Sequence, residues 1–220
     1  MTSHAITAHR RSYRFCGLFI MGIVALGAMQ QYASAQTTIV QVEEDWELVV
    51  ANPNGNQSGP QITCVMSPDC ECHDTHFTFE INHLDLPEFV AGGLQVQEWD
   101  GEISMHVNRH PDKTAIMNTP NETIRWTQRL ILNESTLTFD IVNGTSTTWG
   151  TFGGQGYMRM VVLANHDNLN GYDPNLTVSS SGIGFASNRV ESLILREVRW
   201  TTNDGQVLVD STPRVLHQLP

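Results

Sequence analysis

The chain has 220 residues and a net charge of −11 at pH 7, with 23 acidic residues against 12 basic ones. Nucleic acids and anionic membranes attract proteins through Lys and Arg side chains, which neutralise phosphate charge. So acidic a composition excludes nucleic acid as a partner. It is compatible with a soluble surface, and with carboxylates that hold Ca²⁺.

The first 35 residues have the pattern of a secretory signal peptide. Arg10, Arg11 and Arg14 form a basic region, an apolar run follows at 18–29, and Ala33-Ser34-Ala35 is a small-residue cleavage site. The apolar run is too short for a membrane span, which needs about 20 residues. We expect this segment to be removed and the mature protein to be secreted, into the periplasm or outside the cell. Its loss takes three arginines and no acid, so the net charge falls from −11 to −14.

Residues 36–220 are expected to form one antiparallel β-sandwich domain after the signal peptide (1–35). Many short segments have an apolar period of two and are separated by turn signals, and no ten-residue segment keeps a helical apolar period. No linker-like composition divides the chain, and about 185 residues suit one domain. The expected strands are 45–51, 61–66, 76–84, 93–99, 103–107, two within 123–150, then 157–164, 176–185, 190–200 and 206–209.

The two strands within 123–150 predict a hairpin whose register follows from their apolar pattern. Their apolar sets must share one face, because a one-residue slip would turn one set toward water. A four-residue loop at 133–136 then places Leu130 against Phe139 on the inner face and Arg129 against Asp140 on the outer face.

The last long strand changes its inward set from Leu193 and Leu195 to Val198 and Trp200, which predicts a β-bulge near Arg196. The predicted core includes Trp46, Phe79, Trp126, Leu130, Phe139, Ile141, Leu193, Leu195 and Val198.

The run Trp126…Leu137-Thr138-Phe139-Asp140-Ile141-Val142-Asn143-Gly144, with the later Val190–Arg196, resembles laminin-G and concanavalin A-like jelly rolls. The resemblance covers roughly the second half of the mature chain and rests on patterns that many β-sandwiches share. It implies a two-sheet jelly roll from a superfamily rich in secreted glycan binders. Glycosidases of that superfamily show an E-x-D-x-x-E strand, which this sequence lacks, so no catalytic residue is carried over.

Three cysteines remain in the mature chain, Cys64, Cys70 and Cys72. One interpretation is a disulfide from Cys64 to Cys70 or Cys72, which leaves one free thiol. The alternative is a metal site that adds His73 or His76 to the three cysteines, although the spacing is unusual for zinc.

The segment 166–171 overlaps a calcium-loop pattern, but His166 and Thr177 occupy positions where carboxylates are expected. Asp167, Asn170 and Asp173 could still hold Ca²⁺ in an irregular loop. The competing interpretation is a turn built from Asn, Asp and Gly.

Trp149, Phe152 and Tyr157 flank a glycine-rich turn and could stack on sugar rings, although aromatic side chains in a sandwich usually belong to the core. For catalysis, the sequence offers only Asp100 and Glu102 beside Trp99, and Asp140, as candidate carboxylates. The common motifs of serine hydrolases, zinc proteases and nucleotide-binding loops are absent.

The leading interpretation is an exported, non-catalytic binding or cell-envelope-associated module with a polysaccharide or envelope component as its ligand. The alternatives are a glycan-active hydrolase or lyase of jelly-roll fold, and a structural protein-interaction module. No cofactor is required by any motif, apart from the Ca²⁺ considered above.

Cleavage before Gln36 is directly testable. The mass of the intact secreted protein should match residues 36–220. A secreted chain that still contains the basic and apolar segments would show that they are not a cleaved signal peptide.

Overall fold

The structure, a computed structural model, describes residues 37–53, 59–82, 92–117, 119–154 and 156–220. The signal-peptide prediction lies outside these residues. The described elements are β1 (Ile39–Val50), β2 (Gln61–Met66), β3 (Thr75–Ile81), β4 (Leu94–Asp100), β5 (Ile103–Arg109), β6 (Glu122–Asn133), β7 (Thr136–Ser146), β8 (Gly150–Phe152), η1 (Gly156–Met158), β9 (Arg159–Leu163), α1 (Pro174–Ser180), β10 (Gly182–Phe185), η2 (Ser187–Arg189), β11 (Val190–Thr202), β12 (Val207–Asp210) and β13 (Arg214–Gln218).

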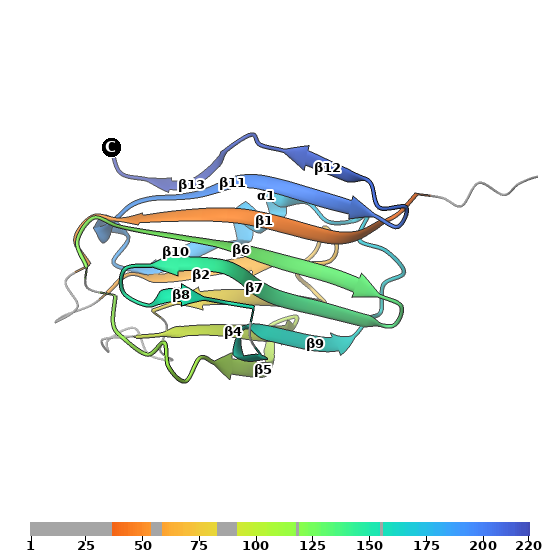
Figure 1. Cartoon of the computed structure of the whole chain (residues 1–220), viewed down its shortest axis with the longest axis horizontal. Helices are drawn as coiled ribbons and strands as arrows, with labels where there is room; N and C mark the ends of the chain where they lie inside the picture. Colours follow the sequence, from red (N-terminus) through yellow and green to blue (C-terminus); the bar gives the residue numbers. More distant parts are fainter. Residues whose placement is uncertain (1–36, 54–58, 83–91, 118, 155) are drawn as a thin grey trace, which may run out of the picture. The chain divides into compact units, whose positions relative to one another are not determined.

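The strands form two antiparallel sheets that pack face to face as a β-sandwich (Figure 1). The eight-stranded sheet has the order β12-β11-β1-β6-β7-β8, with β13 also beside β11 and β9 also beside β7. The five-stranded sheet has the order β10-β2-β3-β4-β5. The all-β sandwich expected from the sequence is confirmed.

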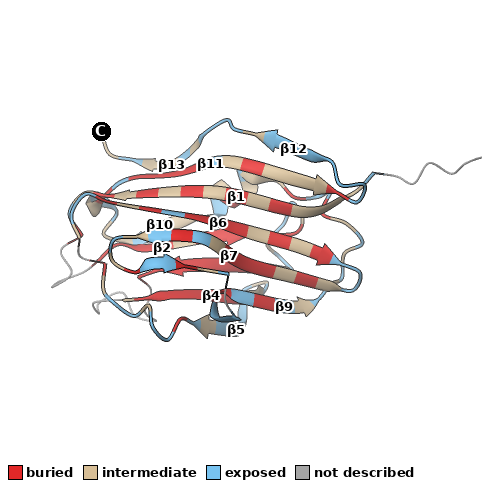
Figure 2. Cartoon of the chain, in the orientation of Figure 1, coloured by how far each residue is buried: buried red, intermediate tan, exposed pale blue. Residues whose placement is uncertain are grey.

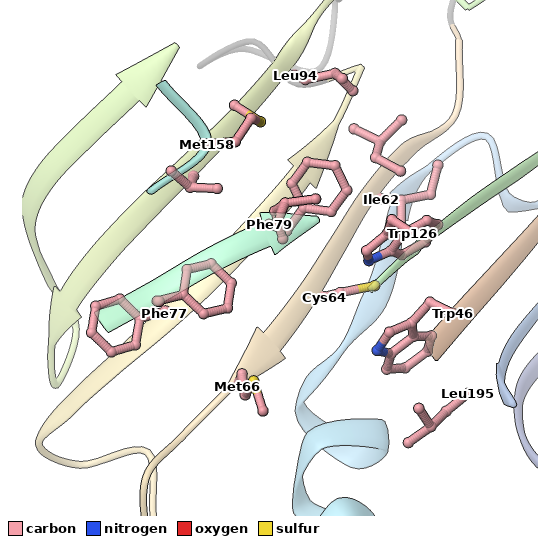
Figure 3. Packing of buried hydrophobic residues seen from close by; sticks show 14 of the residues in the cluster. Trp46, Ile62, Cys64, Met66, Phe77, Phe79, Leu94, Trp126, Met158 and Leu195 are labelled. Carbon is pink, nitrogen blue, oxygen red and sulfur yellow. The ribbon is translucent and has the colours of Figure 1, made fainter. Parts of the chain in front are cut away.

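Aromatic side chains from both sheets meet in the core, as Figure 3 shows for several of them. The ring of Phe77 on β3 stacks on that of Phe139 on β7 with centroids 5.1 Å apart. Phe79 meets Trp126 edge to face at 5.4 Å. Every residue of the predicted core is buried: Trp46, Phe79, Trp126, Leu130, Phe139, Ile141, Leu193, Leu195 and Val198.

The hairpin β6–β7 has the register that its apolar pattern predicts. Leu130 lies opposite Phe139, and Arg129 lies opposite Asp140. The loop is shorter than expected, because Asn133 and Thr136 still pair and only Glu134 and Ser135 remain between the strands. Both loop lengths are even, so the inner face is the same in either case. The even-numbered residues of β6 are all buried, and the odd-numbered ones other than Thr127 are partly or fully exposed (Figure 2).

The predicted bulge at Arg196 is confirmed. Asp45 and Trp46 of β1 lie opposite Glu197 and Leu195 of β11, so Arg196 is the extra residue. A bulge changes which residues point inward, and this explains the shift in the apolar pattern.

The strand expected at 176–185 is wrong for its first part, because residues 174–180 form α1. The side chain of Asp173 accepts a hydrogen bond from the backbone N–H of Asn175 at 2.8 Å, and Pro174 begins the helix. This is a helix N-cap followed by proline, both favourable at a helix start. The helix contacts β2 and β13, so it lies against both sheets.

Truncation of Phe139 should destabilise the protein strongly. The side chain is 0% exposed, and Phe139→Ala should lower the free energy of unfolding by about 3–5 kcal/mol through lost burial and a new cavity. Urea unfolding measures this, with Val161→Ala, a residue 59% exposed on β9, as the control. A loss no larger than that of the control would contradict the packing described here.

Candidate functional site

The predicted aromatic platform is only partly at the surface. Trp149 is 4% exposed and Phe152 is 6% exposed, whereas Tyr157 is 52% exposed. Gly144 permits the burial of Phe152, because a Cβ atom at this position would lie 2.2 Å from the Phe152 ring. The indole N–H of Trp149 donates to the carbonyl of Ala115 at 2.9 Å. Of the three aromatic side chains, Tyr157 alone can therefore present its ring to a ligand.

A cavity of about 270 Å³ lies beside this turn, and we call it the aromatic-turn cavity. The loop after β5 and the end of β8 supply its lining, which consists of His110, Asp112, Lys113, Thr151, Phe152 and Gly153. The ring centroid of Tyr157 lies 5.8 Å from that of His110, which lines the cavity. Lys113 is anchored by donation from its Nζ to the carbonyl of Trp149 at 2.7 Å.

The surroundings of His110 favour its neutral form. Burial lowers its pKa, and the charge of Lys113 acts in the same direction while Asp112 opposes them. The backbone N–H of Asp112 donates to His110 Nδ1 at 3.2 Å, so the ring proton of the neutral form is assigned to Nε2. The site thus combines an exposed aromatic ring, N–H donors and a carboxylate acceptor.

The outer face of the eight-stranded sheet carries a ladder of ion pairs, which we call the charged face. Acidic side chains on β1 lie between arginines on β6 and β11, and Asp140 lies between arginines of β6 and β9. Its members are Glu43, Asp45, Glu47, Arg125, Arg129, Asp140, Arg159, Arg196, Glu197 and Arg199. The five carboxylates balance the five guanidinium groups, so this face is close to neutral on an acidic chain.

A second cavity, of about 360 Å³, opens on the charged face. We call it the charged-face cavity; its lining comes from four neighbouring strands and consists of Asp45, Trp46, Glu47, Arg125, Trp126, Thr127, Asn143, Arg196 and Arg199. Burial raises the pKa of Glu47, but hydrogen bonds from Arg196 and Arg125 outweigh it and hold the pKa below its ordinary value. Hydrogen bonding to Asp45 raises the pKa of Arg199. Ion pairing in this cavity therefore favours the charged forms of Glu47 and Arg199.

The three carboxylates named as catalytic candidates are not brought together. Asp100 and Glu102 are exposed on either side of Gly101, at the turn from β4 to β5 in the five-stranded sheet. Asp140 lies on the other sheet, fully buried beneath Arg129 and Arg159, whose Nη2 atoms donate to it at 2.9 and 2.8 Å. Asp140 therefore acts in the ion-pair ladder.

The loop considered for Ca²⁺ uses its side-chain oxygens within the protein. Asn170 Oδ1 accepts the backbone N–H of Ile39 at 2.8 Å, and Asp173 caps α1. Asp167 is exposed at the surface of this loop. Among the residues that the structure describes, no group of three or more His, Cys, Asp or Glu side chains is arranged to hold a metal ion.

The three cysteines are all free, which corrects the expected disulfide from Cys64. Cys64 is fully buried between the sheets (Figure 3). Cys70 is exposed and Cys72 is partly exposed in the loop after β2. Cys64 lies on the face of β2 that points into the core, so its thiol points away from the loop. Burial, and then the nearby Glu44, raise the pKa of Cys64 well above its ordinary value, as expected for an inert thiol.

Glu44 is a fully buried carboxyl group on the inner face of β1. It accepts hydrogen bonds from Trp46 Nε1 at 2.9 Å, from Gln128 Nε2 and from the Tyr172 hydroxyl. Burial raises the pKa of Glu44, and these donors only partly oppose the effect. The cluster connects β1 and β6 to the segment that leads into α1, so its role is structural.

Sequence reasoning missed both cavities. One signal was available, because Glu43, Asp45 and Glu47 occupy alternate positions beside the core residues Trp46 and Leu48, which predicts an acidic row on one face of a strand. The arginines that neutralise this row come from strands distant in sequence, and no local pattern reveals them.

Comparison with known proteins gives no relative: no family model, curated protein or solved structure matches the chain. Within the described residues, no helix has the length and apolar character needed to cross a membrane. The functional argument therefore rests on the cavities themselves.

The buried Glu44 should make stability depend on pH. Its pKa in the folded protein lies above the ordinary value of 4.5, so the stability associated with its protonated form is lost as pH rises through the folded-state pKa. We expect the free energy of unfolding of the wild type, relative to Glu44→Gln, to fall as pH rises from 4 toward neutrality. Urea unfolding of both proteins across this range measures the difference, and parallel curves would contradict it.

Proposed function

We propose that this protein is an exported, non-catalytic β-sandwich module that binds a polysaccharide, either free or in the cell envelope. The aromatic-turn cavity is the observation that carries the proposal. The signal-peptide pattern of the first 35 residues supports export. The sheet order, in which β11, β1 and β6 are neighbours, supports assignment of the sandwich to the jelly-roll type.

The chemistry of the aromatic-turn cavity suits a sugar. A sugar ring has an apolar C–H face, which packs on an aromatic ring such as the exposed Tyr157. Its hydroxyl groups both donate and accept hydrogen bonds. The cavity offers the Lys113 ammonium and His110 Nε2 as donors, and the Asp112 carboxylate as an acceptor. A concave site with a few placed polar groups is the usual form of a small-ligand site.

A glycan hydrolase is the second candidate, because Asp45 and Glu47 both line the charged-face cavity. Two residues apart on one strand face, they are separated by about 6.6 Å along the strand, within the range used by paired catalytic carboxylates. One member of such a pair must be protonated. Arg125 and Arg196 keep the pKa of Glu47 low, and this favours binding over catalysis.

A glycan-array screen of the purified protein, with and without Ca²⁺, tests the proposed function. For a glycan that binds, Tyr157→Ala should weaken the affinity by about 2–10-fold, the effect of a lost aromatic contact. Leu163→Ala, which truncates a side chain 79% exposed on β9, is the matched control and should bind as the wild type does.

Reducing-sugar release from the bound glycan separates the candidates. Binding without release supports the proposal, and release supports the hydrolase. If no glycan binds in either condition, or if Tyr157→Ala binds as tightly as the wild type, the proposed site is wrong and a protein partner becomes the better explanation.

A further inference from the structure

The charged-face cavity has more hydrogen-bond donors than acceptors. Arg125 donates from Nε to Glu47 Oε2 at 2.8 Å, and its Nη2 lies 2.7 Å from the same oxygen. Arg196 Nη2 donates to the other oxygen, Glu47 Oε1. Both oxygens of this carboxylate are therefore occupied, and the two guanidinium groups lie on either side of it.

The second carboxylate of the cavity is occupied as well. Asp45 Oδ1 accepts from the Thr127 hydroxyl at 2.6 Å and from Arg199 Nη2 at 3.1 Å. Asp45 Oδ2 accepts from Arg199 Nη1 at 2.6 Å. A ligand would therefore find few free acceptors at the floor of this cavity.

Donors remain available at its rim. Three nitrogen atoms make no hydrogen bond to any residue in the described part of the chain. They are Nη1 of Arg125 and both Nε and Nη1 of Arg196. The side chains are 63% exposed for Arg125 and 45% exposed for Arg196. Three arginines and two carboxylates line the cavity. Arg199 also pairs with Glu43 and Glu197, so the free N–H groups of Arg125 and Arg196 are what favour an anionic ligand here.

We propose that the charged-face cavity binds the carboxylate of a uronic acid residue in an acidic polysaccharide, through Arg125 and Arg196. A guanidinium group presents its N–H donors in a planar fork that matches a carboxylate. Glu47 already holds both arginines in place, so binding orders few additional side chains. The acidic remainder of the surface opposes binding weakly, because charges more than about 8 Å away are screened at physiological ionic strength.

The choice of a polysaccharide rests on the proposed function. Asn143 of β7 lines the charged-face cavity, and β8, which pairs with β7, supplies Thr151 and Phe152 to the aromatic-turn cavity. The two cavities thus draw residues from neighbouring strands of one sheet.

Isothermal titration calorimetry with polygalacturonate and with its methyl ester tests the inference, because methylation removes the carboxylate charge and leaves the sugar backbone unchanged. Wild type should bind polygalacturonate more tightly than the ester. Arg125→Gln and Arg196→Gln should each weaken binding of polygalacturonate about tenfold, the loss expected for a hydrogen bond between charged groups. Each variant leaves Glu47 one arginine partner, and circular dichroism would verify its fold.

Arg189→Gln is the matched control, because it removes the same charge from an arginine that donates to the carbonyl of Asn52, outside both cavities. It should bind as the wild type does. Equal affinity for polygalacturonate and its ester, or unchanged binding by both cavity variants, would overturn the inference while leaving the proposed function intact. Equally tight binding of poly-glutamate would show that the site recognises acidic polymers in general and would overturn the choice of a sugar acid.

Discussion

The alternation of side chains along β1 is the constraint on which the two sheets and the charged face both depend. Glu44, Trp46 and Leu48 point into the core and are buried, while Asp45 and Glu47 point to the outer face. Because β1 pairs with β6 on one side and β11 on the other, a slip of one residue would carry the outer carboxylates inward. The stacking of Trp46 on Trp126, with centroids 6.2 Å apart, favours the observed register. The geometry of the charged face is thus a consequence of core packing.

Features encoded over a few consecutive residues could be predicted from the sequence. The pairing of Leu130 with Phe139 follows from two local alternating patterns and an even loop, and the bulge at Arg196 follows from a change of phase within one strand. Each depends only on the period of two imposed by the extended backbone. The same rule wrongly predicted a strand at 176–180, where Leu176 and Val178 are also two residues apart. There, Asp173 and Pro174 start a helix that packs across both sheets.

The cavities could not be predicted, because their side chains meet only after strands distant in sequence have paired. Glu47 contacts Arg125, which follows it by 78 residues, and Arg196, which follows it by 149. The sequence also did not reveal which aromatic side chains of the glycine-rich turn are buried. Trp149 and Phe152 resemble Tyr157 in the sequence, yet the space beside Gly144 admits the Phe152 ring into the core and leaves Tyr157 outside.

The two carboxyl groups of β1 with shifted pKa values explain why a binding protein is favoured over an enzyme. Burial raises the pKa of Glu44, whereas Arg125 and Arg196 lower the pKa of Glu47, so the pKa values of these two carboxyl groups are shifted in opposite directions. Two such groups in one cavity would indicate acid–base catalysis. Their positions differ by three residues, however, so they lie on opposite faces of the sheet, and Glu44 has no contact with solvent. No substrate can reach both groups at once, and the outer face is left with ion-paired groups suited to recognition.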